Sequence, residues 1–479
     1  SNLVRHKLRD LLVPKIPFAA HHKWLGLITV SLGMFLGALD LSVNVALPAI
    51  TESFGSEMST VQWIIILYIG TTAGLQLTIG RLADTYGLKR FYVLGVGIYT
   101  LAVTLIGLST NFDIALGFRI VQAIGYAMIM ATSPALVAQM FDDSARGRAL
   151  GTMTSIGTLG MISATLGGGL LVEQFGWSAI FLARLPFGVI AFALACYVLQ
   201  ELPPKGPRSG PNLAAATALF IGISAVVLIL NLSGRLGWDH ISVLLLILLA
   251  FVSLAIFSRY DKTTSIPILQ LDFLTPTAVK ALLAAFLMAT GSFVNLFLLP
   301  YFLSDILGSG ASALGLLLML APVVGAVVAP VAGFLSDKHP PSWIATWALM
   351  IIVVSFFTFT RLGEQSSAFD VGIRLSLFGA GLGAFQASNM SSLMKEVPDN
   401  RLGMSSALLA FAFSLGMVTS VGLMNTVFTS FLDHASQTML ERQAFLSAFS
   451  KTYLTATIIL GLGVTVSAPW RNLFRTRLR

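Results

Sequence analysis

The sequence predicts an all-helical integral membrane protein with fourteen membrane-spanning helices, arranged as six, two and six. Three observations lead to this fold class: the composition, the number of long apolar segments, and an internal repeat. The chain has 479 residues, of which 56% are hydrophobic and only 10% are charged, whereas soluble domains are about a quarter charged. At about 20 apolar residues per bilayer crossing, there is room for many spans and none for a large soluble catalytic domain.

Fourteen apolar segments, each bounded by Gly, Pro or charged residues, are the predicted spans. They cover residues 24–49, 60–80, 90–109, 114–139, 148–171, 178–199, 212–232, 240–258, 278–303, 312–335, 342–360, 371–394, 404–430 and 452–470. Only helices and closed barrels cross lipid, and continuous apolar runs exclude the alternating pattern of barrel strands. The first segment is too long for the apolar region of a signal peptide, so we expect it to remain as an anchor.

Lysine and arginine are distributed unequally between the two sides of the membrane. If both termini share a side, that side holds 22 of these residues and the other side holds 5. Because cytoplasmic loops are rich in Lys and Arg, we expect both termini to be cytoplasmic, in the inner (plasma) membrane of a bacterium. The formal net charge of +8 then reflects topology, and we expect no nucleic-acid partner.

An internal repeat relates the two parts of the chain. Gly80–Asp84 closes the second span, and Gly333–Asp337 closes the tenth, 253 residues later. Two further echoes follow in order at similar offsets, Arg146-Gly147 with Arg401-Leu402-Gly403 and Leu159-Gly160-Met161 with Leu415-Gly416-Met417. Repeats of this kind indicate two parallel halves. We expect a cytoplasmic N-terminal segment at 1–23, an N-terminal six-helix half at 24–200, a linker with two inserted helices at 201–262, a C-terminal six-helix half at 263–470 and a cytoplasmic tail at 471–479.

These motifs resemble a known family. The segment 80–90, GRLADTYGLKR, is similar to the loop between spans two and three of the major facilitator superfamily, and the segment 39–48, LDLSVNVALP, is similar to the span-one motif of its fourteen-span drug/proton antiporter branch. The span-four motif is matched by Arg119, Gln122 and Gly125, and the entry to span six by Trp177, Ile180, Phe181, Pro186 and Gly188. The resemblance implies the major facilitator fold and secondary transport.

The chain departs from that branch at two places. Arg184 stands where the branch usually has Asn, and Ser163-Ala164 replace the Gly-Pro expected in the span-five antiporter motif. Gly157, Gly160, Gly167 and Gly168 keep the small residues of the same motif. The departure weakens the prediction of antiport while it leaves the facilitator fold intact.

Asp40 is the only acid clearly inside a predicted span, and we expect it to carry a proton. It lies about 15 Å from the outer end of span one at 1.5 Å per residue. Gly33, Gly37, Asp40 and Asn44 share one helical face, which must be turned to protein or to a water-filled cavity because a charge facing lipid is costly. The alternative is a structural hydrogen-bond acceptor that holds span one to a neighbouring helix.

Two arginines also lie within spans. Arg119 lies about 9 Å into span four, at a depth close to that of Asp40, and Gln122 shares its face. We expect Arg119 to act with Asp40 in proton coupling, or else to form a permanent clamp with Gln122 or a carbonyl group. For Arg184 two interpretations remain open, binding of an anionic substrate head and snorkelling to the outer interface.

Other candidate residues fall into two groups. Polar and aromatic side chains with the spacing of a cavity wall are Asn44, Tyr68, Gln76, Gln122, Tyr126, Arg184, Phe293, Asn295, Phe297, Gln386, Asn389 and Asn425; for the aromatic residues, ordinary helix packing is the alternative. The signature loop predicts a conformational latch made by Gly80, Asp84, Gly87, Arg90 and, in the second half, Asp337. Such a latch holds one state of the two halves and contacts no substrate.

These observations together favour a proton-coupled secondary active transporter that exports hydrophobic or amphiphilic small molecules by alternating access. The alternative is an exporter or flippase of a lipid or of an amphiphilic anionic metabolite. We expect no enzyme activity, because no Ser/His/Asp, Cys/His or paired-carboxylate cluster occurs at one depth. We expect no cofactor, since the phosphate-binding G-x-x-x-x-G-K-[ST] motif is absent, and no metal site, since Cys196 is the single cysteine. The expected partners are the substrate, protons and the lipid bilayer, and we expect a monomer.

Overall fold

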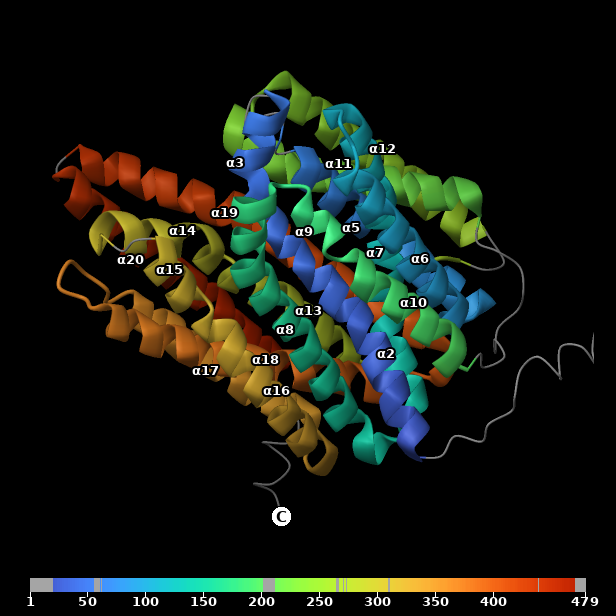
Figure 1. Cartoon of the computed structure of the whole chain (residues 1–479). Coiled ribbons are helices and arrows are strands. Elements are labelled where there is room, and N and C mark those ends of the chain that lie inside the picture. The colour runs from blue at the N-terminus through green and yellow to red at the C-terminus, as the bar shows by residue number, and fades with distance from the viewer. Residues whose placement is uncertain are drawn as a thin grey trace, which may run out of the picture.

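The computed structural model describes residues 20–55, 61, 63–200, 212–263, 267–269, 271–272, 274–308, 311–437 and 439–469, and within these ranges its regular structure is entirely helical (Figure 1). Thirteen of the described helices are long and apolar enough to cross a membrane. The predicted N-terminal segment falls mostly outside the described residues, as do the linker at 201–211 and the C-terminal tail. The side chains of Asn44, Phe297 and Asn425 also lie outside them.

The N-terminal half forms a compact bundle. Its elements are α2 (Ala20–Ala38), the 3₁₀ turn η1 (Leu39–Leu41), α3 (Ser42–Phe54), α5 (Trp63–Tyr86), α6 (Leu88–Gly107), α7 (Phe112–Met140), α8 (Asp143–Phe175), α9 (Ala179–Leu182) and α10 (Leu185–Val198). The Asn111 side chain caps α7 by accepting from the backbone N–H groups of Asp113 and Ile114. Gly87 joins α5 to α6 with φ +113°, a conformation that favours glycine.

The inserted pair consists of α11 (Leu213–Leu236) and α12 (Ile241–Thr263). Helix α11 packs on α5 of the N-terminal half and on α19 (Leu402–Ser436) of the C-terminal half. The approach is close, because a Cβ atom at Gly74 would lie 2.7 Å from the Phe220 ring, and one at Gly422 would lie 2.8 Å from the Leu230 carbonyl oxygen. The insertion therefore lies across the seam between the halves.

The C-terminal half repeats the bundle. Its elements are α13 (Pro276–Ser292), α14 (Val294–Tyr301), the π-helical turn η2 (Phe302–Ile306), α15 (Ala311–Leu318), α16 (Leu320–Lys338), α17 (Pro341–Phe359), α18 (Ala368–Glu396), the 3₁₀ turn η3 (Asp399–Arg401), α19 and α20 (Glu441–Ser467). The expected ninth span, 278–303, is divided at Phe293. Because α13 alone has only 17 residues, the expected count of fourteen spans is not confirmed.

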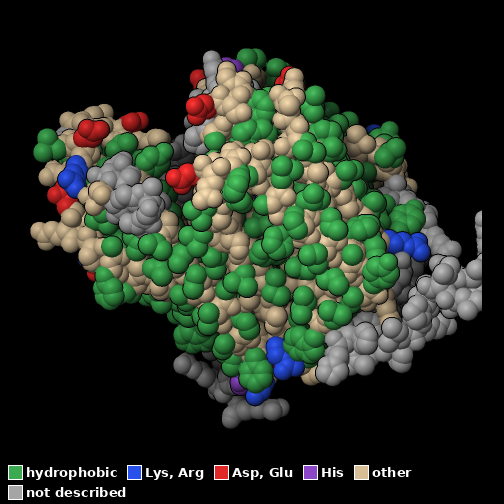
Figure 2. Space-filling model, in the orientation of Figure 1, with side chains coloured by type: hydrophobic (Ala, Val, Ile, Leu, Met, Phe, Trp, Pro, Cys, Tyr) green, Lys and Arg blue, Asp and Glu red, His purple; other side chains and the backbone are tan. Residues whose placement is uncertain are grey.

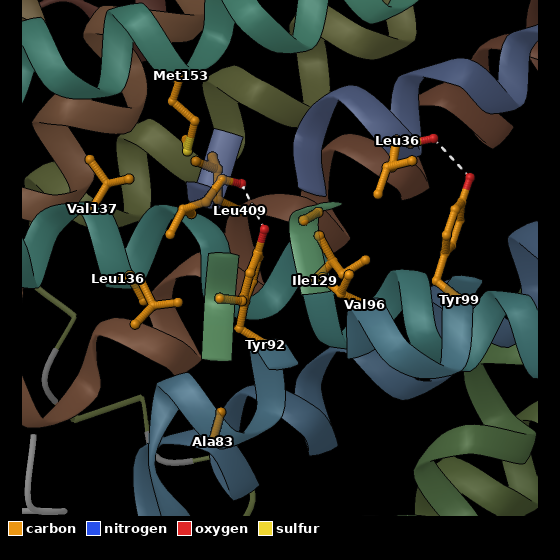
Figure 3. Close-up of a cluster of buried hydrophobic side chains, with 14 of the residues drawn as sticks. Leu36, Ala83, Tyr92, Val96, Tyr99, Ile129, Leu136, Val137, Met153 and Leu409 are labelled. Carbon is orange, nitrogen blue, oxygen red and sulfur yellow. Dashed lines mark hydrogen bonds between the residues drawn. The ribbon is translucent and has the colours of Figure 1, made fainter. Parts of the chain in front are cut away.

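Buried tyrosines of α6 fix the path of α2. The Tyr92 hydroxyl donates to the carbonyl oxygens of Thr29 (2.8 Å) and Val30 (3.2 Å), and the Tyr99 hydroxyl donates to that of Leu36 (2.8 Å). Figure 3 shows both tyrosines reaching out of α6, with Tyr99 joined to Leu36 of α2. Buried hydroxyl groups need such partners, so these bonds place the last turn of α2, and with it Asp40, against the rest of the half.

The α6–α7 contact gives a stability prediction. A Cβ atom at Gly125 of α7 would lie 2.6 Å from the Tyr99 backbone nitrogen and 2.8 Å from the Gly95 carbonyl oxygen. Because backbone atoms cannot move aside as a side chain can, we expect Gly125→Ala to destabilise the protein by about 1–3 kcal/mol, measured as a lower Tm in detergent. Gly117→Ala is the matched control on the same helix, since nothing lies within 4 Å of a Cβ there. Equal Tm values for the two variants would contradict the packing described.

Candidate functional site

Asp40 lies in η1, the turn that joins α2 to α3. The preceding glycines let α2 approach its neighbours: a Cβ atom at Gly33 would lie 2.7 Å from the Tyr92 hydroxyl, and one at Gly37 would overlap the Tyr126 ring. The face that carries Gly33, Gly37 and Asp40 is therefore turned to protein, one of the two environments that the sequence allowed. A 3₁₀ turn within a longer helix often marks a functional hinge.

The Asp40 carboxylate is surrounded by donors from three other helices. Its side chain is only 11% exposed. Arg119 and Gln122 of α7 donate to Oδ1 at 2.9 and 3.0 Å, and Arg184, at the start of α10, donates to the same oxygen at 2.6 Å. The Tyr68 hydroxyl of α5 donates to Oδ2. One carboxylate thus joins α5, α7 and α10 to the α2–α3 junction, and we call Asp40, Tyr68, Arg119, Gln122 and Arg184 the Asp40 cluster.

Arg119 lies where its predicted depth suggested. Its side chain is 3% exposed, and besides Asp40 it donates to the Ile64 carbonyl oxygen at 3.2 Å and to Gln122 Oε1 at 2.6 Å. Its guanidinium carbon lies 4.0 Å from the centroid of the Tyr68 ring, a cation–π contact. Tyr68 in turn stacks on Tyr126, with ring centroids 5.4 Å apart. The expected contacts with Asp40 and with Gln122 are therefore both present in the same structure.

Arg184 does not snorkel, and this corrects one of the two sequence interpretations. Its side chain is 1% exposed, because besides Asp40 it donates to the Leu39 carbonyl oxygen (2.9 Å), the Ser42 hydroxyl (3.0 Å) and the Tyr99 hydroxyl (3.2 Å). These partners lie in the 3₁₀ turn, directly after it and on α6. Sequence reasoning missed Tyr99 and Ser42, since a tyrosine or serine in a membrane helix most often only packs or bonds to its own helix.

The Asp40 cluster carries more positive than negative charge. Two guanidinium groups face one carboxylate, and no other acid in the described part of the chain lies within 4.0 Å of either arginine. Buried charges are costly unless they are paired, and more so in a membrane. Carbonyl oxygens and aromatic rings offset part of this excess, and the formal charge of the cluster is +1.

A second arrangement joins the halves at the end of α5. The Asp84 carboxylate accepts from the backbone N–H groups of Gly403 (2.7 Å) and Met404 (2.8 Å), at the start of α19. In the same way, the Asp337 carboxylate of α16 accepts from Gly147 (2.7 Å) and Arg148 (3.0 Å), near the start of α8. An acid at a helix N-terminus caps free N–H groups and complements the helix dipole. Asp84 therefore caps α19, and Asp337 bonds to α8 one turn after that helix begins. Each half thus holds a helix of the other half, and we call this end of the bundle the latch end.

Small residues make the latch end possible. A Cβ atom at Gly80 would lie 2.8 Å from the Gly403 carbonyl oxygen, and one at Gly147 would lie 2.5 Å from that of Gly333. Figure 1 shows α8 and α16 side by side at this end, whereas α3 and α14 lie apart at the other. The halves are closed at the latch end. Among the other predicted latch residues, Gly87 makes the turn, and Arg90 is exposed.

Comparison with known proteins places this architecture in a family. A family model described as Major Facilitator Superfamily matches residues 25–421 and, in a second match, residues 281–471. The chain belongs to this superfamily. Its members are transporters and not enzymes, and the chain is accordingly a multi-pass integral membrane protein.

Three relatives carry names that state a transported substrate or drug resistance. The riboflavin transporter RibZ of Clostridioides difficile is 28% identical over 93% of this chain and 97% of its own length. The multidrug resistance protein Stp of Mycobacterium tuberculosis is 28% identical over 87% of this chain and 78% of its own. The probable multidrug resistance protein EmrY of Escherichia coli is 24% identical over 86% of this chain and 81% of its own.

Solved structures confirm the facilitator fold. The human organic anion transporter MFSD10 has a TM-score of 0.64 at 17% identity and covers 91% of this chain and 99% of its own. The proton:xylose symporter XylE has a TM-score of 0.62 at 14% identity and covers 92% of this chain and 96% of its own.

The remaining cavity candidates of this facilitator are not brought to the Asp40 cluster by any described contact. Asn295 accepts from the Tyr453 hydroxyl at 2.6 Å, and Asn389 donates to the Ala281 carbonyl oxygen at 2.9 Å. Phe293 packs edge-on against Phe413. Gln76 is buried and Gln386 is half-buried. Asn295, Asn389 and Phe293 therefore have structural partners within the C-terminal half.

Proposed function

We propose that this facilitator is a proton-coupled efflux transporter of hydrophobic or amphiphilic small molecules, with Asp40 as the proton-carrying group. The observation that carries the proposal is the Asp40 cluster, a buried carboxylate that holds three helices to the α2–α3 junction. Two multidrug resistance relatives support the substrate class. Protonation would remove the charge that Arg119 and Arg184 share, so the cluster would lose its strongest bonds in one step.

Helix α5 offers a route from the cluster to the latch. It carries Tyr68 in the cluster and Asp84 at the latch end, 16 residues or about 24 Å along the helix axis. A shift of α5 on protonation of Asp40 would therefore change the geometry of the Asp84 cap. In this scheme Gln122 and the Ile64 carbonyl oxygen keep Arg119 partnered while the halves rock. The Leu39 carbonyl oxygen and the Ser42 and Tyr99 hydroxyl groups do the same for Arg184.

The proposal includes the number of membrane spans and their orientation. We propose that α13 and α14 together form one broken span, which brings the number of spans to fourteen as six, two and six. The halves would then be 24–200 and 263–470, both termini would be cytoplasmic in a bacterial inner membrane, and the transporter would act as a monomer. The latch end, where Lys89 and Arg90 follow Gly87, would face the cytoplasm.

A second candidate function is favoured by the excess positive charge of the Asp40 cluster. Two buried arginines against one carboxylate suit a substrate with an anionic head, as in an exporter or flippase of a lipid or an amphiphilic anionic metabolite. This candidate shares the fold and the rocking mechanism with the first. It differs in that the anionic head of the substrate neutralises the positive charge of the second arginine.

Transport by the purified protein in proteoliposomes tests the proposal. We expect a lipophilic fluorescent dye to move against its gradient when a pH gradient drives protons the opposite way, and a proton ionophore to abolish this uphill movement. Empty liposomes in the same gradient are the control for passive dye partitioning. Uphill dye transport that persists with the ionophore would rule out proton coupling, and transport of anionic amphiphiles alone would favour the second candidate.

A further inference from the structure

A groove lies between α2, α8 and α10, next to the Asp40 cluster. It has a volume of about 160 Å³. Its walls are Phe35, Leu39 and Ser42 from α2 through α3, Ser163, Ala164, Gly168 and Leu171 from α8, and Ile180, Ala183, Arg184 and Phe187 from α9 through α10. The lining is therefore mostly apolar, with Arg184 as its one charged residue. From Phe35 to Ser42, seven residues further along the chain, the groove extends over about 10 Å.

The groove lies on the apolar outer surface of the N-terminal half. Ser163 and Phe187 in its walls are exposed, and so are the flanking side chains of Leu159 and Leu166. Helices α2, α8 and α10 face the viewer in Figure 1, and Figure 2 shows that hydrophobic side chains dominate this face. In a membrane protein such a surface is in contact with lipid, so a molecule dissolved in the bilayer can reach the groove directly.

Both departures of this chain from its family pattern border this one groove. Ser163 and Ala164 stand in place of Gly-Pro on α8, and Arg184 stands in place of Asn before α10. These positions are about 20 residues apart in the sequence and belong to different motifs. In the fold they meet at one place, the wall of this groove.

Arg184 has unused binding capacity. Its Nη1 and Nη2 atoms are engaged by Asp40, Leu39, Ser42 and Tyr99, but its buried Nε has no hydrogen-bond partner among the described residues. An unpaired buried donor on a charged group is expensive, and the cluster as a whole has one positive charge too many. An anionic group in the groove would correct both defects, because carboxylates bind guanidinium groups through charge-assisted hydrogen bonds.

We propose that this groove binds a membrane-dissolved amphiphile with a carboxylate head, with the head at Arg184 and the apolar tail along Phe35, Leu171 and Phe187. The inference rests on the proposed transport function and names a substrate class for it. The substrate enters the groove laterally from the bilayer. Its carboxylate neutralises the positive charge that remains after Asp40 has paired with one of the two arginines. A neutral amphiphile of the same length fits the apolar walls but leaves the charge excess in place, so the head group decides binding.

Equilibrium binding of radiolabelled laurate to the full-length protein in a nonionic detergent tests this inference. We expect saturable binding that unlabelled laurate displaces, and that dodecanol and dodecylammonium, the neutral and cationic analogues, do not. Ser163→Trp, which places a large ring at the groove, is expected to weaken laurate binding at least ten-fold. Leu159→Trp is the matched control one turn earlier on the same exposed flank, outside the groove lining, and is expected to bind laurate like the wild type.

Two outcomes overturn the inference. Displacement by dodecanol as strong as by laurate shows that the groove recognises only an apolar chain, and wild-type affinity in Ser163→Trp shows that laurate binds elsewhere. Ser163 is exposed, so its replacement avoids the folding damage that a change at Arg184 could cause. Binding is measured without a pH gradient, so a positive binding result remains valid even if transport proves independent of protons. Likewise, proton-driven dye efflux remains valid even if laurate does not bind.

Discussion

Asp40→Asn is expected to abolish uphill, proton-driven dye transport while leaving exchange of dye down its own gradient. The amide cannot take up and release a proton, so the cluster keeps one charge state through the whole cycle. Arg119 and Arg184 lose their shared anion, and leaving a buried charge unpaired in this way costs about 3–5 kcal/mol in soluble proteins. The measurement is dye accumulation in proteoliposomes with and without a pH gradient, beside equilibrium exchange of dye in the same vesicles.

A compensated variant separates coupling from folding. Asp40→Asn with Arg119→Gln restores the net charge of the cluster and removes one of the two guanidinium groups that Asp40→Asn leaves without an anion. We therefore expect its Tm to lie above that of Asp40→Asn alone. It should still show no uphill transport, because no titratable acid remains in the cluster. Gradient-driven accumulation in either variant equal to that of the wild type would remove Asp40 from the proton pathway.

Asp84→Ala is expected to open the latch end as a whole, including the contact between Asp337 and α8, in which Asp84 takes no part. Loss of a helix cap costs about 1–2 kcal/mol, which corresponds to roughly a five- to thirty-fold change in the ratio of closed to open molecules. Ser336 is a suitable probe because its side chain is fully buried beside the contact that Asp337 makes with α8. A Cβ atom built at Gly147 would lie 3.2 Å from the Cβ atom of Ser336. Labelling of Ser336→Cys by a polar maleimide, in a Cys196→Ser background, should become at least five-fold faster.

The reciprocal experiment tests whether the halves move as units. Asp337→Ala should speed labelling of Ser405→Cys, since Ser405 is buried near the start of α19 on the Asp84 side. Asp370→Ala is the control, because Asp370 forms a capping box within its own helix, α18, and joins no helices of different halves. If each latch variant affected only the nearer probe, the rigid rocking of the two halves would be excluded.

The latch end is the part of the site that the sequence predicted best. The repeat offset paired Asp84 with Asp337, and the echoes at Arg146-Gly147 and Arg401–Gly403 contain the N–H donors that these acids cap. The reason is physical: small residues and a capping acid must stand at fixed positions in the chain for two helices to meet this closely. That Asp40 and Arg119 lie at a similar level along their helices was predictable too, since rise per residue is constant in a helix.

Neighbours across the bundle were less predictable. Periodicity reports the face and the depth of a residue, and not which helix packs there, so nothing in the sequence indicated that Arg184 bonds to both Asp40 and Tyr99. The break at Phe293 was missed because 278–303 is predominantly apolar, and hydropathy does not register an interruption within an apolar segment. The place of α11 against both α5 and α19 was also hidden, because its partners are ordinary apolar side chains and the glycines Gly74 and Gly422.

The position of α11 makes the two edges of the bundle unequal. Along one edge it covers the meeting of α5 and α19, so that seam is enclosed by protein. Along the other edge α8 and α16 meet with exposed apolar side chains, among them Leu159 and Val327. If the halves rock as proposed, we expect the bilayer to act on that movement mainly through the α8–α16 edge, although the halves repeat each other.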